Sequence, residues 1–107
     1  RMIKVESDYA LCPKFEKAFS ILGKKWNGLI IDVLLEDGKQ RFVELANKIP
    51  QVSDRVLVER LKELEREEIV CKENNLYCLT PRGIALEKSM MSVKRWAETW
   101  VREEECS

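Results

Sequence analysis

The sequence contains no histidine, and its 19 basic and 19 acidic residues leave no net charge. Without histidine, a glycine-rich loop or paired carboxylates at a strand end, nothing assembles a catalytic site, so we expect no enzyme and no cofactor. Zero net charge argues against indiscriminate polyanion binding, which needs a large basic field. It still allows sequence-specific binding, in which only the local charge of the docking surface matters.

Long apolar runs are missing too. No stretch reaches the roughly 18 residues that a membrane span needs, and no signal-peptide pattern opens the chain. We therefore expect a cytoplasmic protein that does not bind membranes.

The four cysteines are Cys12, Cys71, Cys78 and Cys106. Disulfides between them would need an oxidising compartment, which the missing signal peptide argues against. The spacing between Cys71 and Cys78 is not that of a zinc site, so we expect no bound metal.

What the sequence does contain is helical periodicity. A length of 107 residues suits one domain, here residues 1–107. Apolar spacing predicts a helix over about 13–22, a second one ending at Asp37-Gly38, and a short helix that Pro50 stops. The first ten residues show no clear period. A last helix opens at Pro81 and is expected to reach about Glu103.

The middle of the chain predicts a helix-turn-helix unit. After the turn Pro50-Gln51-Val52, Ser53 is a good N-cap, and Leu57, Leu61 and Leu64 form a narrow apolar edge. Two short strands follow, joined by Asn74-Asn75, a pair that tolerates a tight hairpin turn. We therefore predict an α+β, mostly helical fold: a winged helix-turn-helix over about 24–80, between terminal helices over about 13–22 and 81–103.

The helix after Ser53 has the composition of a recognition helix. One edge anchors it, while near its N-terminal half five residues stay free: Ser53, Arg55, Val58, Glu59 and Lys62. Such side chains can reach base edges in a major groove about 12 Å wide. An ordinary solvated surface helix is the alternative. The tight turn before it and the hairpin after it favour double-stranded DNA as the partner.

Five short motifs in this order resemble the HxlR-type winged-helix regulators of bacteria and archaea, over about Cys12 to Trp100. They are Cys12-Pro13, Gly23-Lys24-Lys25-Trp26, Arg41-Phe42-Val43-Glu44-Leu45, the helix residues Ser53–Leu57 with Leu61–Glu65, and Leu79-Thr80-Pro81-Arg82-Gly83. The resemblance implies a dimeric transcription regulator whose terminal helices form the interface. It also implies that the five recognition-helix residues meet the major groove and that Arg41 and Arg60 contact phosphates.

The wing departs from that family pattern. Glu68 stands where members usually have glycine, and the wing is short, without the usual proline and basic tip. Its tip residues Asn74 and Asn75 either reach a phosphate or serve only as turn formers.

An apolar stripe along the terminal helices predicts a homodimer interface. Its members are Phe15, Phe19, Met90, Val93, Trp96, Ala97 and Trp100. Aromatic residues and methionine are enriched at interfaces. The alternative is that the stripe only covers the chain's own hairpin.

Cys12 is the candidate redox-sensing residue. It precedes Pro13 and so caps the first helix, where the helix dipole and the nearby Lys14 and Lys17 favour a thiolate. Some members of the resembling family sense oxidants, quinones or aldehydes through a cysteine at this matching position. The alternative is that Cys12 is a small buried hydrophobic residue.

For the whole chain, the rival hypothesis is a winged helix that contacts another protein and does not bind DNA. The neutral charge and the short wing favour this hypothesis.

Overall fold

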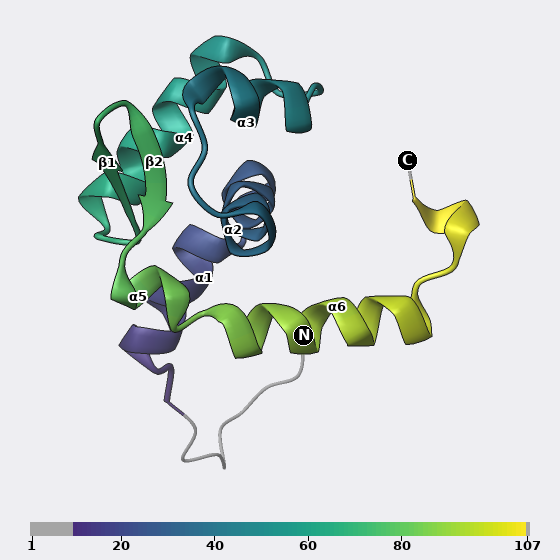
Figure 1. Cartoon of the computed structure of the whole chain (residues 1–107). Coiled ribbons are helices and arrows are strands. Elements are labelled where there is room, and N and C mark those ends of the chain that lie inside the picture. The colour runs from purple at the N-terminus through teal and green to yellow at the C-terminus, as the bar shows by residue number, and fades with distance from the viewer. Residues whose placement is uncertain (1–9, 107) are drawn as a thin grey trace.

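The computed structural model describes residues 10–106, so the interpretation of the first nine residues lies outside the described part. The elements in chain order are α1 (Pro13–Leu22), α2 (Lys25–Asp37), α3 (Phe42–Lys48), α4 (Asp54–Arg66), β1 (Val70–Glu73), β2 (Leu76–Leu79), α5 (Pro81–Ile84), α6 (Glu87–Trp100) and the 3₁₀ helix η1 (Glu103–Glu105). Helices α2 to α4 and the hairpin pack together, as Figure 1 shows. This order confirms the predicted winged helix-turn-helix.

The core lies where α2, α3, α4 and the hairpin meet. Its fully buried aliphatic side chains are Ile30, Ile31, Leu45, Leu57, Leu61 and Leu64. Leu57, Leu61 and Leu64 are the apolar edge that the sequence predicts for α4. They attach this helix to the core and leave its other faces in solvent. Burying such side chains stabilises the fold by about 1.5–3 kcal/mol each relative to leaving them exposed.

The start of α4 is built as the sequence predicts. The Ser53 hydroxyl accepts a hydrogen bond from the Val56 amide at 3.2 Å, which satisfies one of the unpaired amides of the first turn. Val52 and Leu57 on either side of the cap are both buried. The cap and the buried pair together fix the angle at which the chain enters α4.

The wing is an antiparallel hairpin with a two-residue turn. Asn74 and Asn75 have φ of 53° and 65°, the left-handed region that this turn requires. Gln40 adds a short bridge on the other side of β2: its amide donates to the Tyr77 carbonyl at 3.0 Å, and the Tyr77 amide donates back at 2.7 Å. The wing is therefore attached to the α2–α3 connection as well as to α4.

The expected continuous helix over 81–103 is wrong, because the structure divides it into α5 and α6. Thr80 holds the start of α5: its hydroxyl donates to the Glu68 carbonyl at 2.6 Å and accepts from the Gly83 amide at 3.1 Å. A Cβ at Gly83 would lie 2.3 Å from the Ile69 carbonyl oxygen, so α5 is locked against the start of the wing. The chain then changes direction, and Leu86 packs against the core.

Helix α6 also ends earlier than expected, at Trp100. Val101 is extended, and the three consecutive glutamates form the separate short helix η1. Negative side chains are unfavourable at a helix C-terminus, where the macrodipole is negative, which accounts for the early end.

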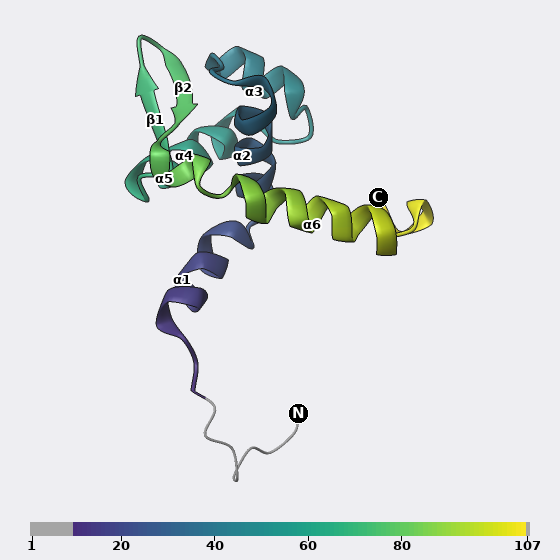
Figure 2. The same cartoon turned by 60° about the horizontal axis from the view of Figure 1, so that its bottom comes forward.

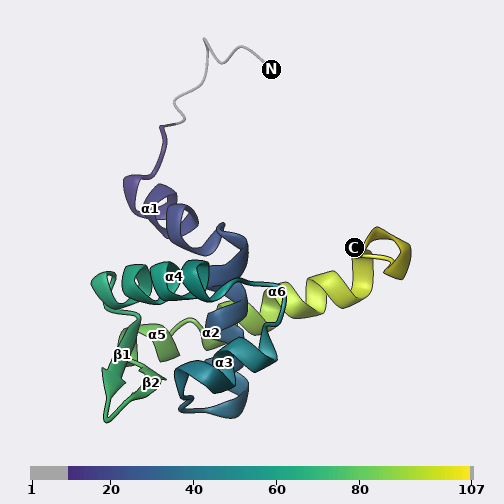
Figure 3. The same cartoon turned by 90° about the horizontal axis from the view of Figure 1, so that it is seen from above.

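The terminal helices project from the core. Figures 2 and 3 show α1 and α6 leaving it in different directions. The Cα radius of gyration is 16.2 Å, against about 13 Å for a compact domain of this length. Lys94 holds α6 to α2 through ion pairs with Asp32 at 2.7 Å and Glu36 at 3.2 Å. Of the helices in residues 10–106, none has the length and apolar character of a membrane span.

Candidate functional site

One face of α4 is free of the core. Arg55, Val58, Glu59 and Lys62 are all exposed, at the i, i+3, i+4 and i+7 spacing of one helical face. Ser53, at the cap, is exposed too. The five residues predicted to meet a major groove are thus brought to one accessible surface, opposite the buried leucines.

The two cations on that face are not neutralised. Among the described residues, Arg55 and Lys62 take part in no ion pair, whereas Lys17, Lys24 and Lys48 each pair with an acidic side chain. With two cations and the single carboxylate of Glu59, the α4 face carries a small positive charge on a chain with no net charge. Groups of this kind bind phosphate oxygens or the acceptor atoms of guanine.

A surface hollow joins the start of α3 to the wing. It has a volume of about 340 Å³, and Arg41, Lys72 and Asn75 are among its lining residues. Asn75 thus serves as a turn former and also faces a hollow with two cations. Lys72 was missed by the sequence reasoning. Its Nζ lies 5.3 Å from the centre of the Tyr77 ring, a cation–π arrangement that holds it at this hollow.

Arg60, the other predicted phosphate contact, is directed toward Glu63. Its Nη1 lies 3.0 Å from Glu63 Oε1, and its side chain is only 23% exposed. The Glu63 carboxylate also accepts from Lys24 Nζ at 2.7 Å and from Asn27 Nδ2 at 3.3 Å. Arg60 therefore belongs to a polar cluster between α2 and α4, set apart from the exposed face. Its contact with phosphate stays a prediction.

The partners of Glu63 in that cluster favour its ionised form. Burial disfavours the ionised form of Glu63, but hydrogen bonds from Lys24 and Asn27 and the charge of Arg60 outweigh it, so the pKa of Glu63 lies below 4.5. Asn27 is fully buried and also donates to the Ile21 carbonyl at 2.9 Å. The sequence reasoning missed Asn27 and Glu63. The available signal was a polar residue within the apolar stripe of α2.

The predicted dimer residues divide into two groups. Phe15, Phe19, Val93, Trp96 and Trp100 are between 58% and 67% exposed. Met90 and Ala97 are half-buried, and Met90 packs against the chain's own core. Met90 is thus covered by the chain itself, while the aromatic members have no cover among the described residues, and the dimer interface stays a prediction.

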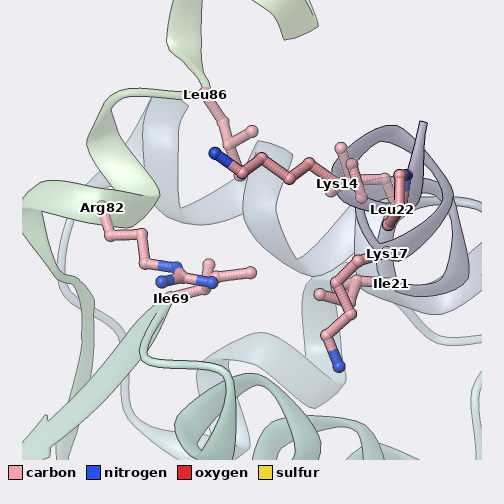
Figure 4. Close-up of a pocket in the computed structure, with 9 residues that line it drawn as sticks. Lys14, Lys17, Ile21, Leu22, Ile69, Arg82 and Leu86 are labelled. Atoms are coloured by element: carbon pink, nitrogen blue, oxygen red, sulfur yellow. The ribbon is translucent and has the colours of Figure 1, made fainter.

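Cys12 lies at the N-cap of α1, as predicted, and is exposed rather than buried. Helix α1 forms one wall of a groove of about 400 Å³, whose other wall includes Ile69, Arg82 and Leu86. Figure 4 shows Lys14 reaching from α1 toward Leu86 across this groove. Cys12 itself is not among the residues that line this groove, but its neighbour Pro13 is.

Comparison with known proteins agrees with this geometry. A family model for HxlR-like helix-turn-helix proteins matches residues 21–105. The chain is 47% identical over 95 residues to the HTH-type transcriptional regulator YodB of Bacillus subtilis (strain 168), covering 82% of this chain and 84% of YodB. These relatives are transcription regulators, which confirms the expectation that the chain is not an enzyme.

Two solved structures are similar over most of their length. The crystal structure of quinone-bound YodB from B. subtilis has a TM-score of 0.79 at 50% identity, covering 83% of this chain and all (100%) of that one. The redox regulator HypR in its reduced form has a TM-score of 0.74 at 32% identity, covering 80% and 91%.

Proposed function

The chain belongs to the HxlR-like helix-turn-helix family of transcription regulators, and from this premise we propose that it binds double-stranded DNA as a homodimer and that chemical modification of Cys12 changes this binding. The observation that carries DNA binding is the exposed face of α4, with Arg55 and Lys62 free of ion pairs among the described residues. Its N-terminal half enters the major groove, and Arg41, Lys72 and Asn75 bind the flanking backbone.

The exposed aromatic residues support the homodimer. Phe15 and Phe19 on α1 stack edge to face with their ring centres 4.8 Å apart, and both remain more than half exposed. On α6, Trp96 and Trp100 lie one turn apart and are 60% and 67% exposed. Exposed aromatic pairs on two projecting helices are unusual on a monomer and typical of an interface. A second copy of the chain would bury them and place two recognition helices on one duplex.

The regulatory part of the proposal rests on Cys12. Its thiol is exposed at the first turn of α1, the helix that carries Phe15 and Phe19. Quinone binding by YodB and the redox response of HypR give the class of signal: a quinone or an oxidant. A quinone would react by addition: the thiolate forms a carbon–sulfur bond, and the ring takes up a proton to become a hydroquinone thioether. Such an adduct alters the surface through which α1 meets the partner.

DNA binding is tested by titrating the protein into two labelled duplexes, the DNA upstream of its own coding region and a random duplex of equal length. We expect the upstream DNA to bind about 10³-fold or more tightly, with affinity falling steeply between 50 and 200 mM salt, values typical of specific regulators. Absence of any salt-dependent binding to either duplex would instead favour a protein-contact module.

The role of Cys12 is tested on the same duplex. Wild type and Cys12→Ser are treated with one equivalent of benzoquinone, and Cys106→Ser serves as a control because Cys106 is also an exposed thiol. We expect the affinity of wild type and Cys106→Ser to change and that of Cys12→Ser to stay constant. A quinone effect that survives in Cys12→Ser would assign the response to another residue.

A further inference from the structure

Two cysteines face each other across the wing. Cys71 on β1 and Cys78 on β2 are direct partners in the strand register, and their Sγ atoms are 2.8 Å apart. Both are free thiols and half-buried. The pair plays no part in the proposed DNA or dimer contacts.

The sulfur atoms of this pair, more than its backbone, favour a disulfide. Tyr77 pairs with Gln40 through both its amide and its carbonyl, so the next pair in the alternating antiparallel ladder, Cys71 and Cys78, is a hydrogen-bonded one. The Cα atoms of such a pair are about 5.5 Å apart, within the range found in disulfides, but its side chains lie farther apart than those of a non-hydrogen-bonded pair. The two Sγ atoms nevertheless lie 2.8 Å apart. Closing the sulfur atoms from 2.8 Å to a bond of about 2.05 Å moves them by less than about 1 Å.

Small oxidants have access to the pair. Cys78 lines a hollow of about 350 Å³ whose other walls include Lys39, Gly38 and Ile84. This hollow lies on the side of β2 that faces the end of α2. A molecule the size of a hydroperoxide fits there without any rearrangement of the wing.

A metal site does not explain the pair. In the part of the chain that the structure describes, no three His, Cys, Asp or Glu side chains gather in a way that could hold a metal ion. Structural zinc takes four ligands, so two thiols alone are insufficient.

We propose that Cys71 and Cys78 form a reversible disulfide within the wing when the protein meets a hydroperoxide, which gives the chain a dithiol redox site separate from Cys12. One thiolate attacks the peroxide, the O–O bond breaks, and a sulfenic acid and an alcohol form. The second thiol attacks the sulfenic sulfur, the S–S bond forms, and water leaves. Two thiols thus supply the two electrons that reduce one hydroperoxide to an alcohol and water.

The two thiols are in contact before any oxidant arrives. The hydrogen bond with Cys71, together with burial and the negative charge of Glu73, raises the pKa of the Cys78 thiol to about 11 while the pair is intact. Whichever sulfur is oxidised first, the other is the resolving thiol and already lies 2.8 Å from it.

The experiment uses the full chain with Cys12→Ser and Cys106→Ser, so that only the wing thiols remain. After treatment with hydrogen peroxide, we expect the intact mass to fall by two hydrogen atoms, both reactive thiols to disappear, and dithiothreitol to restore them. Peptide mapping should join the segments that contain Cys71 and Cys78. Neither DNA nor Cys12 is needed, so this result is independent of the proposed function.

Two matched controls carry a further Cys71→Ser or Cys78→Ser substitution. With either thiol alone we expect a sulfenic acid that dimedone traps, and no loss of two hydrogen atoms within one chain. Retention of both thiols in the two-cysteine variant, or a linkage formed only between two chains, would overturn the proposal.

Discussion

Lys24 Nζ and Glu63 Oε2 are 2.7 Å apart, and this ion pair ties the start of α2 to the C-terminal half of α4. The same carboxylate holds Arg60 and the buried Asn27. The angle at which the recognition helix leaves the core therefore depends on one acidic side chain, which is only 13% exposed.

Replacing Glu63 with glutamine keeps the shape of the side chain and removes its charge. We expect the free energy of unfolding to fall by about 1–2 kcal/mol at pH 7. This loss lies between the small contribution of an exposed ion pair and the larger cost of breaking a buried one. The pKa of Glu63 is lowered in the folded chain, so its stabilisation is present above the ordinary value of 4.5 and is lost as the pH falls through the folded pKa. The difference between wild type and Glu63→Gln should therefore shrink in acid.

Urea denaturation at a series of pH values measures this difference. Glu104→Gln is the control, because Glu104 pairs with Arg102 at a side-chain exposure of 74% and contributes little. Equal stability of wild type and Glu63→Gln at pH 7 would show that the polar cluster does not stabilise the fold.

Glu68 carries backbone strain that glycine would relieve. Its φ of 62° lies in the left-handed region, directly before the wing. We expect Glu68→Gly to stabilise the chain by about 0.5–1 kcal/mol, since the relief exceeds the entropy that glycine costs. Thermal unfolding compares it with Glu59→Gly, an exposed position inside α4, which should lose about 1 kcal/mol. Loss of stability in both variants would count against strain at Glu68.

Arg55 and Lys62 should contribute to DNA binding in different ways. If Arg55 reads a base, Arg55→Ala lowers affinity by about 1–3 kcal/mol for the specific duplex and relaxes discrimination at one base pair. Lys62→Ala, if that side chain meets a phosphate, weakens binding to all sequences and reduces the salt dependence. Fluorescence anisotropy measures both, with Lys88→Ala on α6 as the matched control. Unchanged affinity in all three variants would place the interface elsewhere.

A negative charge placed beside the exposed tryptophans of α6 should separate the two copies of the chain. Trp100 is 67% exposed in the single chain, so Trp100→Glu leaves the core intact. We expect the dimer dissociation constant to rise at least a hundredfold, because a hot-spot tryptophan contributes about 2 kcal/mol or more and a buried unpaired carboxylate adds a further cost. Sedimentation velocity at micromolar concentration measures this. Val43→Glu, at a residue 58% exposed on α3, is the control and should remain dimeric.

Local features of this chain were predictable from sequence. The Ser53 cap, the Asn74-Asn75 turn and the leucine edge of α4 all formed as expected. Each depends on residues within a few positions of one another, so short-range geometry suffices. The Cys71–Cys78 contact belongs here as well: once the turn is placed, counting back along both strands makes them partners.

The sequence by itself thus determined the element order as far as the wing, the winged helix-turn-helix fold and the exposed face of α4. Only the tertiary structure decided that Arg60 turns inward to Glu63, that Gln40 pairs with Tyr77, and that the last helix breaks after Ile84. Each of these three features depends on contacts that the residue's own neighbours in sequence do not reveal. The break after Ile84, for example, follows from the close packing of Gly83 against the Ile69 carbonyl. Periodicity reports which face of a helix is apolar, but the position of the surface it packs against sets where the helix must bend.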